Sequence, residues 1–545
     1  MMMTHSTRLV RTVGMYVLTP ALLLIASSCT NLTEAPNNAL TPETAFQTDA
    51  QVLAGMAGIY AQLRPLDNNV GYMSVEGLPT DEIIVPTRGS DWFDNGQWLD
   101  MHRQTWTANS GGTLTFLNGT WNDIFSGVAK ANLLIDVIAK AANCDANLGG
   151  CNNPKSDSLL AELRTLRAFD YYMLQNLFGG VPLVTGTSSA QVARATRKDI
   201  FTFVEKELLA SRDKLPKKWP AAFSGRVTSG AANAILASLY LNAGVFTKET
   251  GINATGYNAC TGVAVTGGDA CAGAIAAANA VINSGIYTLN PQWASNFAPN
   301  NQSSPENIFV IAHAKIQDLG TNWPMRTLHY NQIPSTQGGA WNGFSTTAET
   351  YAAFSPTDDR RGMWLAGPQV SFETGLPVTD RTGKPLVFTP AIPDASAAPE
   401  AQGVRFNKFA PLPFAASGSD HPDDFTIFRL AEMYLIRAEA ENESGQTAQA
   451  IIDLNFIHNK HDPTKPLTVT TQAQVRDAIY KERQLELSAE GKRRADMIRF
   501  GKFLSWTEAS ANGVAAAPRD AHYLLFAIPA PQIASNPLLS QNAGY

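Results

Sequence analysis

Two segments of the chain combine aromatic side chains with short polar ones at a density that suits ligand binding. One spans residues 91–106 and the other spans residues 322–342. A sugar offers C–H faces that stack on aromatic rings and hydroxyls that bind amides or carboxylates, so such segments could bind carbohydrate. The alternative is that the rings only pack these loops against the rest of the fold. The candidate ligand-binding residues are Trp92, Trp98, Trp106, Trp323, Tyr330 and Trp341.

Three carboxylates recur every four residues near the C-terminus, at Glu482, Glu486 and Glu490. On one helix they form a row, and like charges at this spacing repel unless cations lie beside them. We interpret the row as a helix docked at a charged, partly buried junction, and not as a catalytic cluster. The cations close to it in sequence are Arg483, Arg493 and Arg494.

The sequence gives little support for catalysis. It contains no His-Glu-x-x-His, Gly-x-Ser-x-Gly or phosphate-binding glycine loop. Asp81 and Glu82 are adjacent, so they cannot by themselves supply the two carboxylates that a glycosidase places across a cleft. His458 and His461 have helical spacing, but their charged neighbours indicate a solvated helix end. We expect a binding protein with no catalytic residue, cofactor or metal. A surface glycoside hydrolase with an all-helical fold is the alternative from another class.

The five cysteines divide into one near the N-terminus and two local pairs. Cys144 and Cys151 bracket one short segment, and Cys260 and Cys271 bracket a loop rich in Gly, Thr and Val. Both pairs fit short disulfides formed in an oxidising compartment. A metal site is the rival interpretation, but the pairs lack Cys-x-x-Cys spacing and a nearby histidine. Cys29 remains for another role.

The N-terminus has the pattern of a secretory signal. Arg8 and Arg11 precede an apolar run, 16–26, that is too short to span a bilayer. Ala26-Ser27-Ser28-Cys29 resembles a bacterial lipobox, in which the Cys29 thiol is acylated after cleavage. Acyl chains bury about 0.8 kcal/mol per CH₂, so two or more anchor a protein stably. The predicted parts are a leader at 1–28, a tether at 29–40 and a single body at 41–545.

The composition favours an uncharged polar ligand. The formal net charge is −6, and removing the two arginines of the leader makes the chain more negative. This balance argues against a nucleic-acid partner. Charged residues form only 16% of the chain, against about 25% in average domains. Amides, hydroxyls and glycines take their place on the surface.

Apolar residues at three- and four-residue intervals predict a mainly α-helical protein. Several predicted helices come in pairs across a Gly- or Pro-containing turn and resemble tetratricopeptide-like hairpins, although a strict 34-residue period is absent. Long stretches with few helix signals, 67–118 and 291–420, separate them, and such loops are usually functional. The predicted helices are 52–63, 121–138, 159–177, 200–215, 231–241, 274–282, 428–443, 448–458 and 475–490.

Motifs along almost the whole mature chain resemble the SusD/RagB family of surface nutrient-binding lipoproteins, in the order typical of that family. The most specific are Glu482-Arg483, Glu490-Gly491-Lys492-Arg493 and Asp496-Met497, although Arg494-Ala495 stands where family members usually carry aromatics. The other matching segments are 80–82, 91–92, 121–132, 163–172, 178–184, 225–227, 231–241, 284–287, 358–361, 428–441, 528–529, 536–537 and 541–545.

The resemblance implies a SusD-like fold whose ligand face is built from loops on the side away from the helical repeats. It implies a lipid-anchored protein of the outer membrane, facing the exterior, that binds an oligosaccharide and delivers it to a SusC-like TonB-dependent transporter. Because SusD/RagB-like proteins are not confined to glycans, a peptide ligand is the alternative within the family. The implied parts are helical repeats at about 41–65, 119–290 and 425–500, with ligand-face insertions at about 67–118 and 291–420.

Overall fold

The computed structural model describes residues 46, 48–141, 154–333, 339–411, 420–508 and 517–545. The chain divides into two units, 1–45 and 46–545, and all of the described residues belong to the second. The predicted leader and tether, Cys29, and the pair Cys144 and Cys151 lie outside the described residues.

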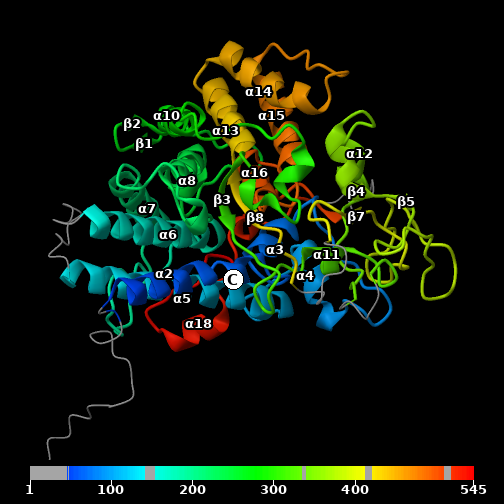
Figure 1. Ribbon diagram of the computed structural model, residues 1–545, viewed down its shortest axis with the longest axis horizontal. Helices are drawn as coiled ribbons and strands as arrows, with labels where there is room; N and C mark the ends of the chain where they lie inside the picture. The colour runs from blue at the N-terminus through cyan, green and yellow to red at the C-terminus, as the bar shows by residue number, and fades with distance from the viewer. Residues whose placement is uncertain (1–45, 47, 142–153, 334–338, 412–419, 509–516) are drawn as a thin grey trace, which may run out of the picture. The chain divides into compact units, whose positions relative to one another are not determined.

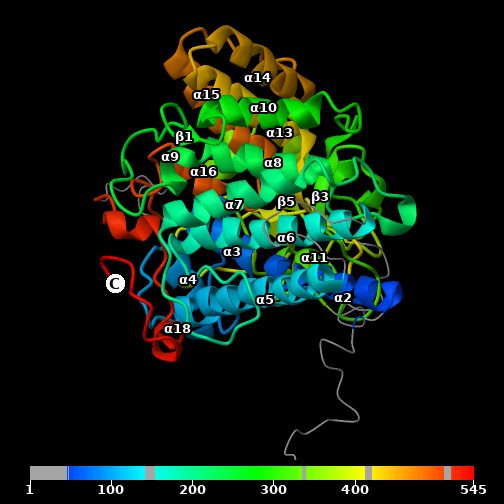
Figure 2. The same ribbon diagram turned by 90° about the vertical axis from the view of Figure 1, so that its left-hand side faces the viewer.

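The longer helices pack on one another largely in chain order. Helix α5 packs on α6, α6 on α7, α7 on α8, α8 on α10, α10 on α13, and α13 on α14 and α15. Figure 2 shows this stack from α5 to α14. The predicted mainly α-helical class is confirmed, while the tetratricopeptide-like character of the hairpins stays a prediction. The helices are α2 (Asp49–Ala61), α5 (Asn118–Ala141), α6 (Pro154–Phe178), α7 (Arg197–Ser211), α8 (Ser229–Leu241), α10 (Ala270–Ile282), α13 (Leu430–Glu443), α14 (Thr447–His461), α15 (Gln472–Glu486) and α16 (Arg493–Arg499).

Local signals explain where several helices begin and end. Thr48, Thr196 and Thr471 form capping boxes at the starts of α2, α7 and α15, because each hydroxyl accepts a backbone N–H that the helix itself leaves unpaired. The predicted helix 428–443 begins two residues late, at Leu430, because residues 425–429 form a strand. The predicted helix 475–490 ends early, at Glu486, and Ala489 has a left-handed φ of 60° in the turn that follows.

Short elements lie between the longer helices and after the last of them. Four antiparallel strand pairs are β1 (Ala264–Val265) with β2 (Gly268–Asp269), β3 (Asn307–Ile311) with β8 (Phe425–Arg429), β4 (Trp364–Leu365) with β7 (Arg405–Phe406), and β5 (Gly367–Pro368) with β6 (Val387–Phe388), counted over the described residues. Short helices are α3 (Tyr72–Gly77), α4 (Gln97–His102), α9 (Ala243–Phe246), α11 (Trp323–Thr327), α12 (Ala348–Ala353) and α18 (Ala530–Ser535). Single turns are η1 (Arg64–Asp67), η2 (Asp94–Gly96), η3 (Thr113–Leu117), η4 (Ala221–Phe223), η5 (Trp293–Asn296), η6 (Asn301–Ser303), η8 (Asp359–Met363) and η9 (Ala521–Leu524).

The insertions gather on one side of this unit. In Figure 1, α4, α11, α12, β4, β5 and β7 lie to the right, and α2, α6, α7, α8 and α10 lie to the left. The β3–β8 pair lies between the two groups and joins segments more than 100 residues apart. The β3–β8 pair therefore connects the loop-rich side to the helical stack.

A disulfide joins Cys260 and Cys271 around the β1–β2 hairpin. Both cysteines are buried, and Asp269 caps α10 by accepting the N–H groups of Cys271 and Ala272. The bond thus fixes the hairpin to the start of α10. A loop of this size contributes up to about 3 kcal/mol in the chain-entropy picture.

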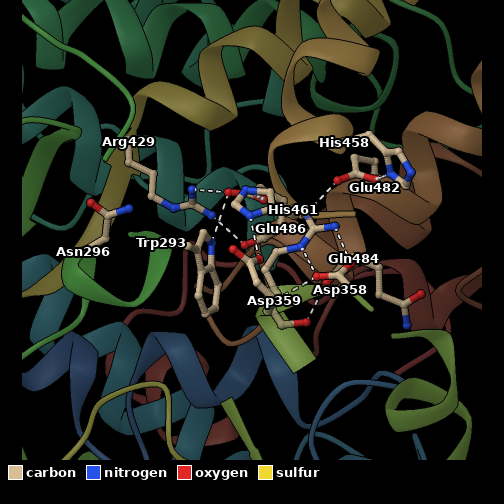
Figure 3. Close-up of polar contacts among 12 residues, drawn as sticks. Trp293, Asn296, Asp358, Asp359, Arg429, His458, His461, Glu482, Gln484 and Glu486 are labelled. Carbon is tan, nitrogen blue, oxygen red and sulfur yellow. Dashed lines mark hydrogen bonds and ion pairs between the residues drawn. The ribbon is translucent and has the colours of Figure 1, made fainter. Parts of the chain in front are cut away.

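A cluster of buried charges joins α15 to the β3–β8 pair (Figure 3). The Arg429 guanidinium, at the end of β8, donates to Glu306 (2.9 Å), Glu486 (2.5 Å) and Glu490 (2.9 Å). Arg360 donates to Glu482 and Glu486, at 2.6 Å each, and to Asp358 at 2.8 Å. The predicted charged junction is present, and it is fully buried. Its two arginines, Arg360 and Arg429, come from segments that are far from α15 in the sequence.

The arginines that were expected beside the glutamate row serve other carboxylates. Arg493 and Arg494 lie beyond the turn that follows Glu486, and Arg483 lies within α15 beside Asp496. The pairs are Arg483 with Asp496 (2.8 Å), Arg493 with Asp81 (2.5 Å) and Arg494 with Glu76 (3.3 Å). These contacts attach the end of α15 to α16, and the start of α16 to α3 and the loop after it.

The prediction that His458 and His461 lie at a solvated helix end is wrong. Both are buried on the face of α14 that meets α15. His458 Nδ1 lies 2.8 Å from Glu482, and His461 lies 2.8 Å from Asp359 and 3.2 Å from Glu486. Burial opposes the charged imidazole, but the Glu486 and Asp359 carboxylates outweigh it and raise the pKa of His461 to about 9.

We expect His461 to make stability fall as the pH rises from about 6.5 to 9. Its raised pKa means that the stabilisation is complete below the unfolded-state pKa and is lost as the pH passes the folded-state value. The lost free energy is at most about 3 kcal/mol. Urea unfolding at several pH values measures it.

The matched control is His461→Gln, measured over the same range. Burial raises the pKa of the Glu82 and Asp423 carboxyls to about 8, and these groups also lower stability as the pH rises. The difference between the two proteins isolates His461. Equal pH dependence in both would contradict a charged His461.

Candidate ligand-binding surface

Three of the six candidate aromatic residues have no exposed ring face. Trp98, Trp106 and Trp323 are 1%, 0% and 2% exposed. Their indole N–H groups donate to Asp94 (2.7 Å), Tyr545 (2.7 Å) and Asp67, and the Trp323 ring stacks on Phe409 and Phe425. The expectation of an exposed ring is wrong at these three positions, because each indole finds its packing and its hydrogen bond inside. They hold the loops in place.

The other three, Trp92, Tyr330 and Trp341, are half-buried and come together. The Trp92 and Trp341 ring centroids are 6.5 Å apart with planes tilted by 47°, and Trp92 Nε1 donates to the Trp341 carbonyl at 2.7 Å. The Tyr330 hydroxyl donates to Asp91, next to Trp92, at 2.6 Å. We call these three residues the aromatic surface. It draws on both predicted segments, 91–106 and 322–342.

Two buried arginines fix the backbone beneath the aromatic surface. Arg88 Nε donates to the Asn342 carbonyl (2.9 Å), and Arg405 Nη2 donates to the Asn342 side chain (2.8 Å). Their remaining bonds reach the carbonyls of Glu400 and Gln402, among others. Burial lowers the pKa of Arg88 to about 10 and that of Arg405 well below its usual range. The segment that carries Trp341 and Asn342 is thereby tied to Arg88 and to the segment 400–405.

A half-exposed arginine closes one edge of the aromatic surface. The Arg381 guanidinium lies 4.2 Å from the Tyr330 ring centroid and donates to Asp91 at 2.8 Å. It also pairs with Glu400, whose other oxygen lies 3.0 Å from His329 Nε2. One face of Tyr330 is therefore covered by a cation. Trp92 and Trp341 remain as candidates for stacking on a ligand.

Glu400, the carboxylate at this edge, is poorly suited to act as a general acid. Partial burial opposes ionisation of Glu400, but hydrogen bonds from the Arg381 backbone and guanidinium lower the pKa of its carboxyl. A glycosidase needs one carboxylic acid with a raised pKa near the scissile bond. Glu400 has the opposite shift. The row at Glu482, Glu486 and Glu490 is buried and ion-paired, and so cannot reach a ligand.

Sequence reasoning missed two residues at this surface. Phe93 is 55% exposed beside Trp92, and its position in the aromatic and polar run 91–98 was the available signal. Arg381 comes from the loop between β5 and β6, and nothing in the sequence relates it to Asp91, 290 residues away.

Pockets also lie elsewhere on the described residues, two of them with charged residues in their linings. One, of about 620 Å³, includes Arg194, Glu249, His522 and Asn542 in its lining. The other, of about 400 Å³, includes Arg64, His313 and Asp420. Neither is lined by any of the six candidate aromatic residues.

The fold and the aromatic surface together define a mainly α-helical protein that carries a group of half-buried aromatic residues on its loop insertions. A family model described as the SusD family matches residues 391–545, and one described as "Starch-binding associating with outer membrane" matches residues 43–241. The two together cover more than half of the chain. The chain belongs to the SusD/RagB family, and the resemblance predicted from its motifs is confirmed.

Similar proteins span nearly the same length. The "Starch-binding protein SusD" of Bacteroides thetaiotaomicron is 26% identical over 86% of this chain and 84% of its own. "SusD-like protein P25" of Formosa agariphila is 23% identical over 87% of each chain. Surface glycan-binding protein A from Bacteroides thetaiotaomicron, solved in complex with laminarihexaose, has a TM-score of 0.69 at 21% identity, over 91% of this chain and 99% of its own. At that identity the structure shows a shared fold.

We expect Arg405→Met to lower the free energy of unfolding by about 3 kcal/mol or more. It leaves the buried Asn342 side-chain oxygen and the buried Gly403 carbonyl without the donors that Arg405 supplies, and each such group costs about 1–3 kcal/mol. Arg381→Met is the matched control, because this side chain is 49% exposed and its ion pairs are worth less than about 1 kcal/mol. Urea unfolding measures both. Equal losses would contradict the role given to Arg405.

Proposed function

We propose that this protein is a lipid-anchored protein of the outer membrane that captures an oligosaccharide and delivers it to a SusC-like TonB-dependent transporter. The observation that supports capture is the aromatic surface, where Trp92 and Trp341 lie 6.5 Å apart beside the polar groups of Asp91 and Arg381. Rings stack on the C–H faces of sugars, and the polar groups bind hydroxyls.

The names of the relatives support a carbohydrate ligand. They include a starch-binding protein, a laminarin-binding SusD-like protein and a surface glycan-binding protein in complex with laminarihexaose. These ligands belong to those proteins, and for this chain they indicate which glycans to test first.

The location and the partner are supported by the sequence and the family. The matching family model is described as associating with the outer membrane. Cys29 ends a lipobox-like sequence, and across the described ranges the helices are too short or too polar to cross a membrane. Delivery to a transporter rests on the family resemblance. It requires capture to be reversible, since a ligand that is held too tightly is not passed on.

We expect the lipid-free protein, starting after Cys29, to bind one member of a panel of plant, microbial and storage glycans, including laminarin and starch oligosaccharides. Trp92→Ala and Trp341→Ala should each weaken that binding about tenfold or more, because stacking area is lost. Isothermal calorimetry measures the affinity. Trp219→Ala is the matched control: a half-buried tryptophan that stacks on Arg226 away from this surface.

Three outcomes would count against the proposal. Glycan binding that neither substitution weakens would place the ligand elsewhere. Binding of peptides in place of glycans would favour the other ligand class within the family. Release of reducing sugar by the purified protein would favour the glycoside hydrolase.

A further inference from the structure

The loop that carries Trp92 has an unfavourable backbone. Trp92, Asp94 and Asn95 have φ angles of 62°, 37° and 56°, in the left-handed region. Asn and Asp tolerate this region, but a bulky aromatic residue rarely adopts it. Such conformations persist only where the surroundings hold them, and they cluster at functional sites. The contacts of the Trp92 side chain therefore need an explanation.

The Trp92 indole lies where a side chain of residue 343 would be. A Cβ atom added to Gly343 would lie 2.4 Å from both Cε2 and Cζ2 of the Trp92 ring. Gly343 does not have a left-handed φ, so its backbone conformation would accept alanine. What requires glycine at this position is the space that the indole occupies.

The neighbouring residues complete a rigid seat for this ring. Trp92 Nε1 donates to the Trp341 carbonyl at 2.7 Å, and the edges of Trp98 and Phe344 meet the ring at centroid distances of 5.0 and 5.9 Å. Asn342, between Trp341 and Gly343, itself has a φ of 51° and is held by Arg88 and Arg405. Both stacking rings thus depend on the one segment 341–344.

We propose that Gly343 is a positioning residue for ligand capture. Having no side chain, it lets the Trp92 indole lie against the 341–344 backbone, and so fixes the indole beside Trp341 before any ligand arrives. Preorganised rings lose less entropy on binding than mobile ones. The proposal rests on the proposed function for its ligand, and on the geometry of the seat for the role of Gly343.

The test is Gly343→Ala, with Gly362→Ala as the matched control. Gly362 is exposed on the same loop-rich side, has no left-handed φ, and a Cβ atom there meets nothing within 4 Å. Calorimetry with the glycan that the wild-type protein binds best should show affinity reduced about tenfold by Gly343→Ala and unchanged by Gly362→Ala. Wild-type affinity in Gly343→Ala would overturn the proposal.

A double-mutant cycle with Trp92→Phe separates positioning from a general structural effect. The smaller ring leaves room for a methyl group, so Gly343→Ala should weaken binding much less in the Trp92→Phe background. An equal loss in both backgrounds would overturn the proposal, because the effect would not pass through the indole.

The seat can also be tested if the wild-type protein binds no glycan, in which case the proposed function fails separately. The Trp92 contribution to acrylamide quenching of fluorescence is the difference between the wild-type protein and Trp92→Phe. Gly343→Ala should increase the quenching of this component, because the indole is displaced towards solvent, and Gly362→Ala should not. An unchanged component would overturn the positioning role.

Discussion

Buried guanidinium groups are the constraint on which this fold depends. Each carries five N–H donors and a charge, so it is stable in the interior only where oxygens from several segments converge on it. Arg429 gathers Glu306, Glu486 and Glu490, and so sets the end of α15 against the β3–β8 pair. Arg360 adds a second link from the loop-rich side to α15. The junction between helices and insertions is thus specified by charge pairing as well as by apolar packing.

The same constraint takes another form beneath the aromatic surface. Arg88 and Arg405 are satisfied there by carbonyl and amide oxygens, which requires the backbone to bend towards each guanidinium. Segments with little regular secondary structure become ordered in this way. Binding residues on loops work best when a rigid scaffold positions them. The two arginines supply that rigidity to long insertions whose described strands are short.

The sequence predicts the helices well and the site only in part. Apolar periodicity located the helices because it reports one buried face, but it did not separate β8 from the start of α13, since Phe428 suits both. Composition located both aromatic segments, but it did not indicate which of their rings are exposed. Trp92 and Trp98 lie in the same run of sequence, yet the folded chain buries Trp98 and leaves Trp92 half-buried. Ion partners such as Arg360 and Glu486 meet through tertiary structure, which local spacing cannot encode.

The pairs between α16 and the N-terminal part of the body bear on how the chain folds. Arg493 meets Asp81 across 412 residues and Arg494 meets Glu76 across 418. Closing loops of this length is entropically costly and slow, and contacts that close them form late. Until α16 has been synthesised, Asp81 and Glu76 lack these cations. The region around α3 can therefore complete its native ion pairs only when nearly the whole chain has been synthesised.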